Sequence, residues 1–212
     1  MEPISSIGLR RRIMLLASGA SLLANSSVLA SSGVIVGAAA PSFTVPDTSE
    51  RPRTLQEFAG KTVVLEWTSP SCPFVRAQYE IGAMQAIQSE AAKLGVVWLS
   101  VLSTHRSRGD YLDAAKANEF NKTRGATPTA LLMDVDGAMG RAYGARTTPH
   151  MFIIDPVGKV VYMGAIDDKP SYDAAVVKKS RNLVRAALAD LAAHRPVATP
   201  ISSPYGCAVG YA

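Results

Sequence analysis

The chain has 212 residues, a net charge of +5, 48% hydrophobic residues and 18% charged residues, which excludes a wholly disordered chain, a collagen-like repeat and a coiled coil. Its two cysteines are too few for a disulfide-dense mini-scaffold or a multi-cysteine zinc module. The length predicts one domain with appendages. The sequence after residue 40 contains no block of basic residues, so we do not expect a nucleic-acid partner.

The first 40 residues have the pattern of a secretory signal. Three arginines at residues 10–12 precede an uncharged, mostly apolar run at 13–24, and three alanines at 38–40 supply an A-x-A cleavage sequence. Cleavage after residue 40 fits this pattern, cleavage near Ala30 fits it as well, and an uncleaved anchor is the alternative. The arginines also loosely match a twin-arginine signal.

We therefore expect residues 1–40 to be a signal peptide and the mature protein to be exported, to the periplasm or another extracytoplasmic space. Membrane contact is expected only through this segment. Export implies an oxidising compartment, in which two thiols can form a disulfide.

Strand and helix patterns alternate through the mature chain. The predicted elements are, in chain order, a strand at 62–67, a helix at 73–93, a strand at 96–102, a helix from Asp110 to about 122, a strand at 129–133, a short helix at 138–143, a hairpin with strands at 151–154 and 159–163, and a helix at 172–193. The alternation favours parallel strands with helical crossovers, and the late hairpin adds antiparallel strands. We therefore predict an α/β domain over residues 41–195, with a mixed central sheet flanked by helices on both faces. Residues 196–212, rich in Pro, Ser and Gly, are expected to form a flexible tail.

Cys72 lies between a predicted buried strand and a predicted helix start. The unpaired N–H groups and positive end of that helix favour a thiolate, which is a nucleophile near neutral pH. Arg76, one turn further on, would add positive charge, and the hydroxyls of Thr68 and Ser69 would hydrogen-bond the sulfur or a bound oxygen species. The alternative is that Cys72 is only a small buried hydrophobic residue.

Two segments resemble the thioredoxin-like redoxins. Residues 63–75 (VVLEWTSPSCPFV) resemble the strand, loop and helix start of their active site. Residues 143–164 (YGARTTPHMFIIDPVGKVVYMG) resemble the segment in which a cis-proline precedes a β-hairpin. The resemblance implies a thioredoxin-like fold in which Pro149 is the cis-proline and Thr148 faces the sulfur of Cys72.

The chain departs from that family at three positions. Val75 stands where a thioredoxin has its second cysteine, so the short dithiol cycle is absent. Leu65 and Ser69 replace the Pro and Thr of the peroxiredoxin pattern Pro-x-x-x-Thr-x-x-Cys. The Cys-Pro-Phe-Val at 72–75 and the Gly-Cys at 206–207 resemble the peroxiredoxin-like branch, relatives of alkyl hydroperoxide reductase and thiol-specific antioxidant proteins. That resemblance implies an oxidoreductase that has antioxidant activity, takes part in cell redox homeostasis and uses a single active-site cysteine.

Cys207 lies thirteen residues beyond His194. A chain of that length spans at most about 45 Å, three times the radius of gyration of about 15 Å expected for such a domain, so Cys207 can reach Cys72. Three roles are open: a resolving thiol that condenses with a sulfenic acid on Cys72, a permanent disulfide that fixes the tail, or a free thiol that pairs between chains.

The histidines do not form a metal-site pattern with Cys72, because Arg76 stands where copper-delivery relatives have a second cysteine. We therefore expect neither a metal nor another cofactor. His194 suits a helix C-terminus. His105 belongs to a loop that either raises the positive potential near the site or is simply solvated.

The sequence thus predicts an exported thiol oxidoreductase whose substrate is a peroxide or a protein disulfide and whose reductant is an external thiol, such as a thioredoxin-like protein. The candidate catalytic residues are Cys72, Cys207, Thr68, Ser69, Arg76, Thr148 and Pro149. The alternative is a non-catalytic binding protein that holds an extended peptide at the cis-proline edge and uses a disulfide only to fix its tail.

Overall fold

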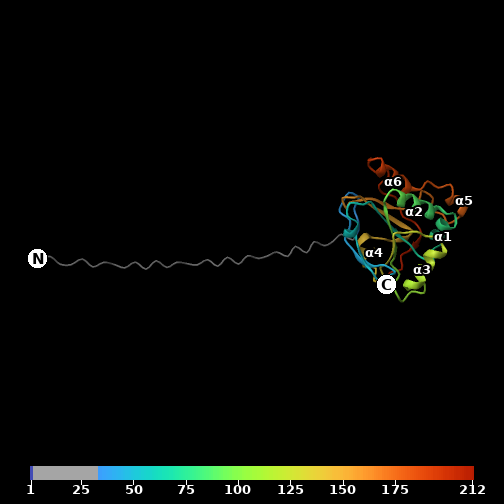
Figure 1. The fold of residues 1–212 in the computed structure, drawn as a ribbon, viewed down its shortest axis with the longest axis horizontal. Coiled ribbons are helices and arrows are strands. Elements are labelled where there is room, and N and C mark those ends of the chain that lie inside the picture. The colour runs from blue at the N-terminus through green and yellow to red at the C-terminus, as the bar shows by residue number, and fades with distance from the viewer. Residues whose placement is uncertain (2–32) are drawn as a thin grey trace. The chain divides into compact units, whose positions relative to one another are not determined.

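The computed structural model describes Met1 and residues 33–212, so most of the predicted signal segment lies outside the described residues. Residues 33–212 form one compact unit (Figure 1). Its helices are α1 (Pro73–Glu80), α2 (Ala83–Lys93), α3 (Ala114–Thr123), α4 (Ala138–Tyr143), α5 (Ala174–Val177) and α6 (Leu183–Ala192). Within this range no helix has both the length and the apolar character needed to cross a bilayer.

A five-stranded mixed sheet forms the centre, in the spatial order β5–β4–β3–β7–β8. The strands β3 (Val63–Trp67), β4 (Val97–Leu102) and β5 (Ala130–Met133) are parallel, whereas β7 (His150–Ile154) and β8 (Val160–Gly164) run antiparallel to their neighbours. Every residue of β3, β4, β5 and β7 is buried, which explains their nearly continuous apolar sequences. The predicted α/β class and mixed central sheet are confirmed.

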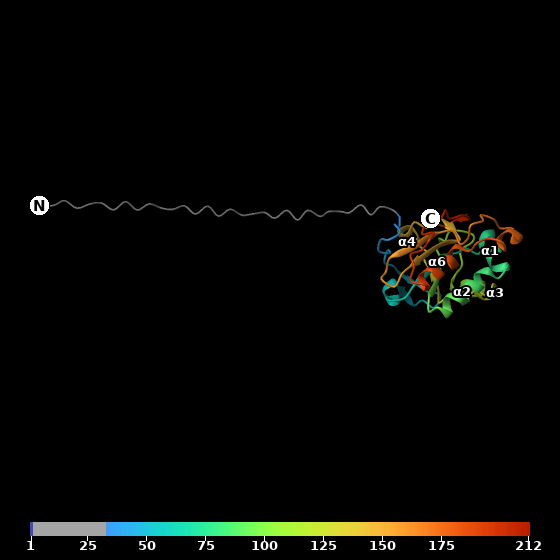
Figure 2. The same cartoon turned by 90° about the horizontal axis from the view of Figure 1, so that it is seen from above.

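Alternation along β3 divides the core into two layers. Leu65 and Trp67 pack on one face with Tyr143 of α4. Val64 packs on the other face with residues of α1, α2 and α6, including Val75 and Val184. Figures 1 and 2 accordingly place α4 on the opposite side of the sheet from α1 and α2.

Both long predicted helices are interrupted. The helix expected at 73–93 divides into α1 and α2 at Gly82, whose φ of +75° is left-handed and breaks the helical path. The helix expected at 172–193 divides into α5 and α6, and Asn182 caps α6 by accepting the N–H of Arg185 at 2.8 Å. Local capping and backbone freedom therefore override a continuous amphipathic pattern.

The start of α3 is also later than predicted. Asp113, not Asp110, is its N-cap, and the Asp113 carboxylate accepts the N–H of Lys116 at 2.9 Å. Asp110 instead accepts the hydroxyl of Ser71 at 2.9 Å.

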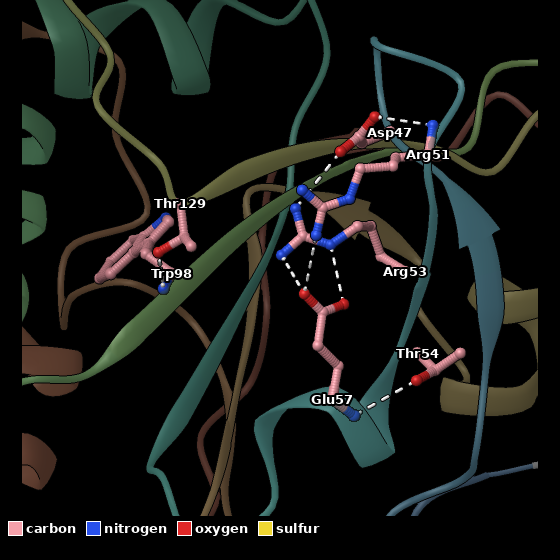
Figure 3. Close-up of polar contacts among 7 residues, drawn as sticks. All are labelled: Asp47, Arg51, Arg53, Thr54, Glu57, Trp98 and Thr129. Atoms are coloured by element: carbon pink, nitrogen blue, oxygen red, sulfur yellow. Dashed lines mark hydrogen bonds and ion pairs between the residues drawn. The ribbon is translucent and has the colours of Figure 1, made fainter.

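A small antiparallel hairpin precedes the central sheet. Its strands are β1 (Thr44–Pro46) and β2 (Pro52–Thr54), and the 3-10 helix η1 (Leu55–Phe58) follows. Figure 3 shows Arg53 between two carboxylates, 3.3 Å from Asp47 and 2.8 Å from Glu57. The same view shows Thr129 accepting the N–H of Trp98 where β4 begins. The first set of bonds joins β2 to the hairpin turn and η1, and the second joins β4 to the residue that precedes β5.

The segment from Gly37 to Ala40, which we predicted to end the signal peptide, packs against the domain. It runs along the free edge of β8, where Gly37 donates to the carbonyl of Val160 at 2.7 Å and Val160 donates to that of Ala38 at 3.0 Å. A domain boundary after Ala40 would cut this pairing. The packed unit that the structure describes therefore includes residues before 41.

The C-terminal segment, residues 196–212, differs from the flexible tail that we predicted. The N–H of Met163 donates to Pro200 at 3.0 Å, and that of Ser202 donates back to Met163 at 3.1 Å. Further on, β9 (Cys207–Ala208) pairs antiparallel with β6 (Thr147–Thr148). Backbone bonds thus lay this segment along β8 and across the end of the sheet.

Candidate active site

Cys72 lies at the N-cap of α1, just after the loop that follows β3. Its backbone is extended, with φ −83° and ψ 116°, and Pro73 occupies the start of the helix. Its side chain has no exposed surface and packs in the apolar cluster that contains Val75 and Met151.

The peptide between Thr148 and Pro149 lies directly against Cys72. This bond is cis, as the resemblance implied. The thiol of Cys72 donates to the carbonyl oxygen of Thr148 at 2.9 Å. The contact is made by the backbone of Thr148 and not by its hydroxyl, whose oxygen is buried and has no hydrogen-bond partner among the described residues.

Cys207 lies beside the same peptide. It is directly opposite Thr148 in the β6–β9 pairing and packs against the cluster that contains Cys72. Both cysteines are free thiols in this structure. Burial and then the interaction with the neighbouring Cys72 thiol raise the pKa of Cys207 above its ordinary value. The structure therefore brings together four of the seven candidate residues: Cys72, Cys207, Thr148 and Pro149.

Gly206 permits this close approach. Its φ is +124°, and a Cβ at this position would overlap the carbonyl oxygen of Thr148. The glycine therefore allows the C-terminal segment to lie on the peptide that also contacts Cys72.

Arg124, which the sequence analysis did not single out, supports the loop before Cys72. The central carbon of its guanidinium lies 3.9 Å from the ring centroids of both Tyr79 and Phe120. Its Nη1 donates to the hydroxyl of Thr68 at 3.0 Å. Thr68 thus bonds to an arginine instead of the sulfur that we expected it to face.

Ser69 and Arg76 also differ from their expected roles. The hydroxyl of Ser69 lies 3.1 Å from that of Ser71. The side chain of Arg76 is 69% exposed and forms a surface ion pair with Glu80, with Nε 3.4 Å from Oε1. In this conformation, no hydrogen bond within the described part of the chain joins either side chain to the sulfur of Cys72.

A second unpredicted residue, Glu66, is a fully buried carboxylate on β3 beneath α1 and α2. It accepts hydrogen bonds from Trp98 and Ser100 at 2.8 Å each, from Tyr79 at 3.1 Å and from Gln88 at 3.3 Å. These donors compensate the burial of its charge. Burial and the charge of Glu66 raise the pKa of Tyr79. The single acidic residue in the apolar run of β3 was the available sequence signal.

Within the described residues, no histidine is hydrogen-bonded to either cysteine. His150 is 4% exposed, and burial followed by the charge of Arg146 lowers its pKa from 6.5 to about 4. The N–H of His105 donates to the carbonyl of Gly210 at 2.8 Å, in a loop that also holds Arg106 and Arg108. Among the described residues, no cluster of three or more His, Cys, Asp or Glu is arranged to hold a metal ion.

Comparisons with known proteins agree with this architecture. Residues 36–163 match the model of the AhpC/TSA family, whereas no curated protein matches the chain. A hypothetical protein from Sinorhizobium meliloti is 24% identical with a TM-score of 0.72, over 85% of this chain and 96% of its own. An uncharacterized conserved protein from Geobacillus kaustophilus is 23% identical with a TM-score of 0.74, over 84% and 93%.

A putative thiol:disulfide interchange protein DsbE from Chlorobium tepidum is 23% identical with a TM-score of 0.51, over 62% of this chain and 85% of its own. The likeness to this solved structure confirms the thioredoxin-like fold.

Proposed function

The chain belongs to the AhpC/TSA family, and from this premise we propose that it is a thiol-dependent oxidoreductase in which Cys72 and Cys207 form one redox couple. The observation that carries the proposal is the position of Cys207 opposite Thr148, whose carbonyl accepts the Cys72 thiol. A resolving cysteine must lie near the reactive one, because a disulfide tolerates only a narrow range of geometries. The structure supports the first of the three roles that the sequence left open for Cys207.

The first step is attack by the Cys72 thiolate on an oxygen of a hydroperoxide. An S–O bond forms as the O–O bond breaks, the leaving oxygen takes a proton, and the sulfur is oxidised to a sulfenic acid. The N-terminus of α1 stabilises the thiolate that begins this step.

The second step joins the two cysteines. The sulfur of Cys207 attacks the sulfenic sulfur of Cys72, an S–S bond forms, and the S–O bond breaks. The oxygen leaves as water together with the proton of Cys207. The two cysteines together supply the two electrons that reduce the hydroperoxide to an alcohol or to water.

Burial favours a small oxidant and an external reductant that attacks Cys207. Cys72 has no exposed surface, which favours a hydroperoxide over a protein disulfide. Cys207 is partly exposed, so a thiol of a thioredoxin-like protein would reach its sulfur first. Attack there releases Cys72 as the thiolate, at the helix end that stabilises it.

Export is part of the proposal. The arginines, apolar run and small residues of the N-terminus support a signal peptide, and the pairing of Gly37 and Ala38 with Val160 supports cleavage near Ala30. N-terminal sequencing of the protein from a periplasmic fraction is expected to give a start before residue 34. A start at residue 41 would contradict this.

The test of the redox couple begins with the fully reduced protein and one equivalent of hydrogen peroxide. Intact mass and non-reducing peptide mapping are expected to show a loss of about two mass units and a Cys72–Cys207 link that a thiol reductant reverses. The variant Cys72→Ser is expected to consume no peroxide. Retained consumption in that variant would overturn the mechanism. A link that resists thiol reductants would support a structural disulfide, and with it the binding-protein alternative.

A further inference from the structure

A buried carboxylate outside the cysteine pair joins the two segments that carry the pair. Asp167 is 2% exposed and accepts a hydrogen bond from Nε2 of Gln78, on α1, at 2.7 Å. It also accepts the phenol of Tyr205 in the C-terminal segment. Its other donors are the hydroxyl of Ser180 at 2.9 Å and the N–H of Lys169 at 3.0 Å. Asp167 therefore connects the helix that begins at one cysteine to the segment that holds the other.

Tyr205 makes a second contact with that helix. Its ring packs edge-on against Phe74, with ring centroids 5.7 Å apart. Phe74 lies two residues after Cys72, and Tyr205 lies two residues before Cys207. Burial, and then the hydrogen bond and charge of Asp167, raise the pKa of the Tyr205 phenol, which therefore remains a donor.

We propose that Asp167 and Tyr205 are positioning residues that hold Cys207 beside Cys72 for disulfide formation. The inference rests on the proposed function, because it assigns these residues to the step in which the Cys72 sulfenic acid becomes the Cys72–Cys207 disulfide. In that step the S–S bond forms, the S–O bond breaks, and water leaves with the proton of Cys207.

Backbone bonds hold the C-terminal segment on both sides of Cys207, at Ser202 and at Val209. The bond from Tyr205 to Asp167 is the side-chain contact that fixes the residues just before Cys207. A hydrogen bond to a carboxylate is about twice as strong as one between neutral groups. Loss of the bond between Tyr205 and Asp167 is therefore expected to lower the effective concentration of the Cys207 thiol at Cys72 about tenfold.

The test compares Tyr205→Phe with Tyr172→Phe. The first variant removes the phenol that Asp167 accepts and keeps the ring against Phe74. Tyr172 also packs edge-on against Phe74, with centroids 5.2 Å apart, but it is 63% exposed, so it provides a matched loss of a phenol. Rapid mixing with hydrogen peroxide, quenching and mass analysis measure the sulfenic acid and the disulfide separately. Equilibration with glutathione measures the effective concentration of the two thiols.

Tyr205→Phe is expected to form the sulfenic acid at the wild-type rate, but the disulfide about tenfold more slowly, with an effective concentration about tenfold lower. Tyr172→Phe is expected to match the wild type in both steps. Equal disulfide rates in Tyr205→Phe and wild type would overturn the positioning role and leave the proposed function standing. A Tyr205→Phe variant slow in both steps would also overturn it, because a general distortion of α1 would explain the result. Failure of the wild type to form the disulfide would overturn the proposed function itself.

Discussion

Cys207 and Thr148 lie directly opposite each other in the β6–β9 pairing, and the carbonyl oxygen of Thr148 also accepts the Cys72 thiol. One backbone position therefore contacts both cysteines, although they are far apart in the sequence. The C-terminal segment covers Cys72, whose side chain has no exposed surface, and leaves Cys207 partly exposed. The two sulfur atoms thus have different access to solvent, which suits different roles in one redox cycle.

Replacement of Cys207 by serine is predicted to separate oxidation of Cys72 from its recycling. Cys207→Ser keeps a residue of similar size opposite Thr148 but removes the sulfur that we propose as the resolving one. The first equivalent of peroxide is expected to be consumed at the wild-type rate, and a dimedone adduct is expected to form at Cys72. Turnover with a thioredoxin-like reductant is expected to fall at least tenfold. Normal recycling in this variant would remove Cys207 from the mechanism.

Gly206→Ala is predicted to slow disulfide formation at least tenfold. A Cβ there meets the carbonyl oxygen of Thr148, which is backbone and cannot move aside, and the φ of +124° is strained for alanine. Gly210→Ala is the matched control, because the atoms nearest to its added Cβ belong to the flexible side chain of Arg108. Quenched-flow mass analysis of peroxide-treated protein measures the rate of disulfide formation in each variant. Equal slowing in the two variants would show that the close approach at Gly206 has no special role.

The fold was predictable because its strands carry their own signals. β3, β4 and β7 are buried on both faces, so their apolar and β-branched residues form uninterrupted runs. The helix breaks were harder to predict. Gly82 interrupts an otherwise continuous pattern, and a single glycine inside a helical pattern is often tolerated. The packed C-terminal segment was not predictable, since its partners, such as Met163 and Thr148, are contributed by distant parts of the chain.

The candidate site was predictable only where one short segment contains the signal. Cys72 and Pro149 each lie in a recognisable motif, and the structure places both beside Cys207, beyond the end of the central strand β3. The expected roles of neighbouring side chains were less reliable, because sequence proximity does not define side-chain direction. Arg76, one turn from Cys72, faces solvent, whereas Arg124 reaches the active-site loop from the end of α3.

These two arginines are predicted to differ in their effect on stability. Arg124→Ala loses contacts with two aromatic rings and a hydrogen bond to Thr68, so the free energy of unfolding is expected to fall by about 1–3 kcal/mol. Arg76→Ala loses an exposed ion pair with Glu80 and is expected to change the free energy of unfolding by less than about 0.5 kcal/mol. Urea denaturation at neutral pH measures both. A smaller loss in Arg124→Ala than in Arg76→Ala would contradict the proposed support of the loop.

The low pKa of His150 predicts a loss of stability at acidic pH. Burial and the charge of Arg146 lower that pKa from 6.5 to about 4, so between these values the unfolded chain binds a proton that the folded chain does not. Stability from this group is therefore complete above pH 6.5 and declines as the pH falls toward 4. From pH 7.5 to pH 5, the expected decrease in the free energy of unfolding is about 2 kcal/mol.

His150→Asn tests this contribution while keeping an acceptor for the N–H of Arg146, which Nδ1 of His150 now accepts at 3.3 Å. The variant is expected to lose about 2 kcal/mol less than the wild type between pH 7.5 and pH 5, because asparagine does not titrate. The comparison matters because carboxylates titrate in the same range and contribute equally to both proteins. His194→Asn, which removes an exposed imidazole just beyond α6, serves as the control for replacing a histidine by asparagine at an unburied position. Urea denaturation across this pH range measures the free energy of unfolding of all three proteins. Parallel pH curves for His150→Asn and wild type would contradict the prediction, because they would mean that His150 binds its proton equally well in the folded and unfolded chains.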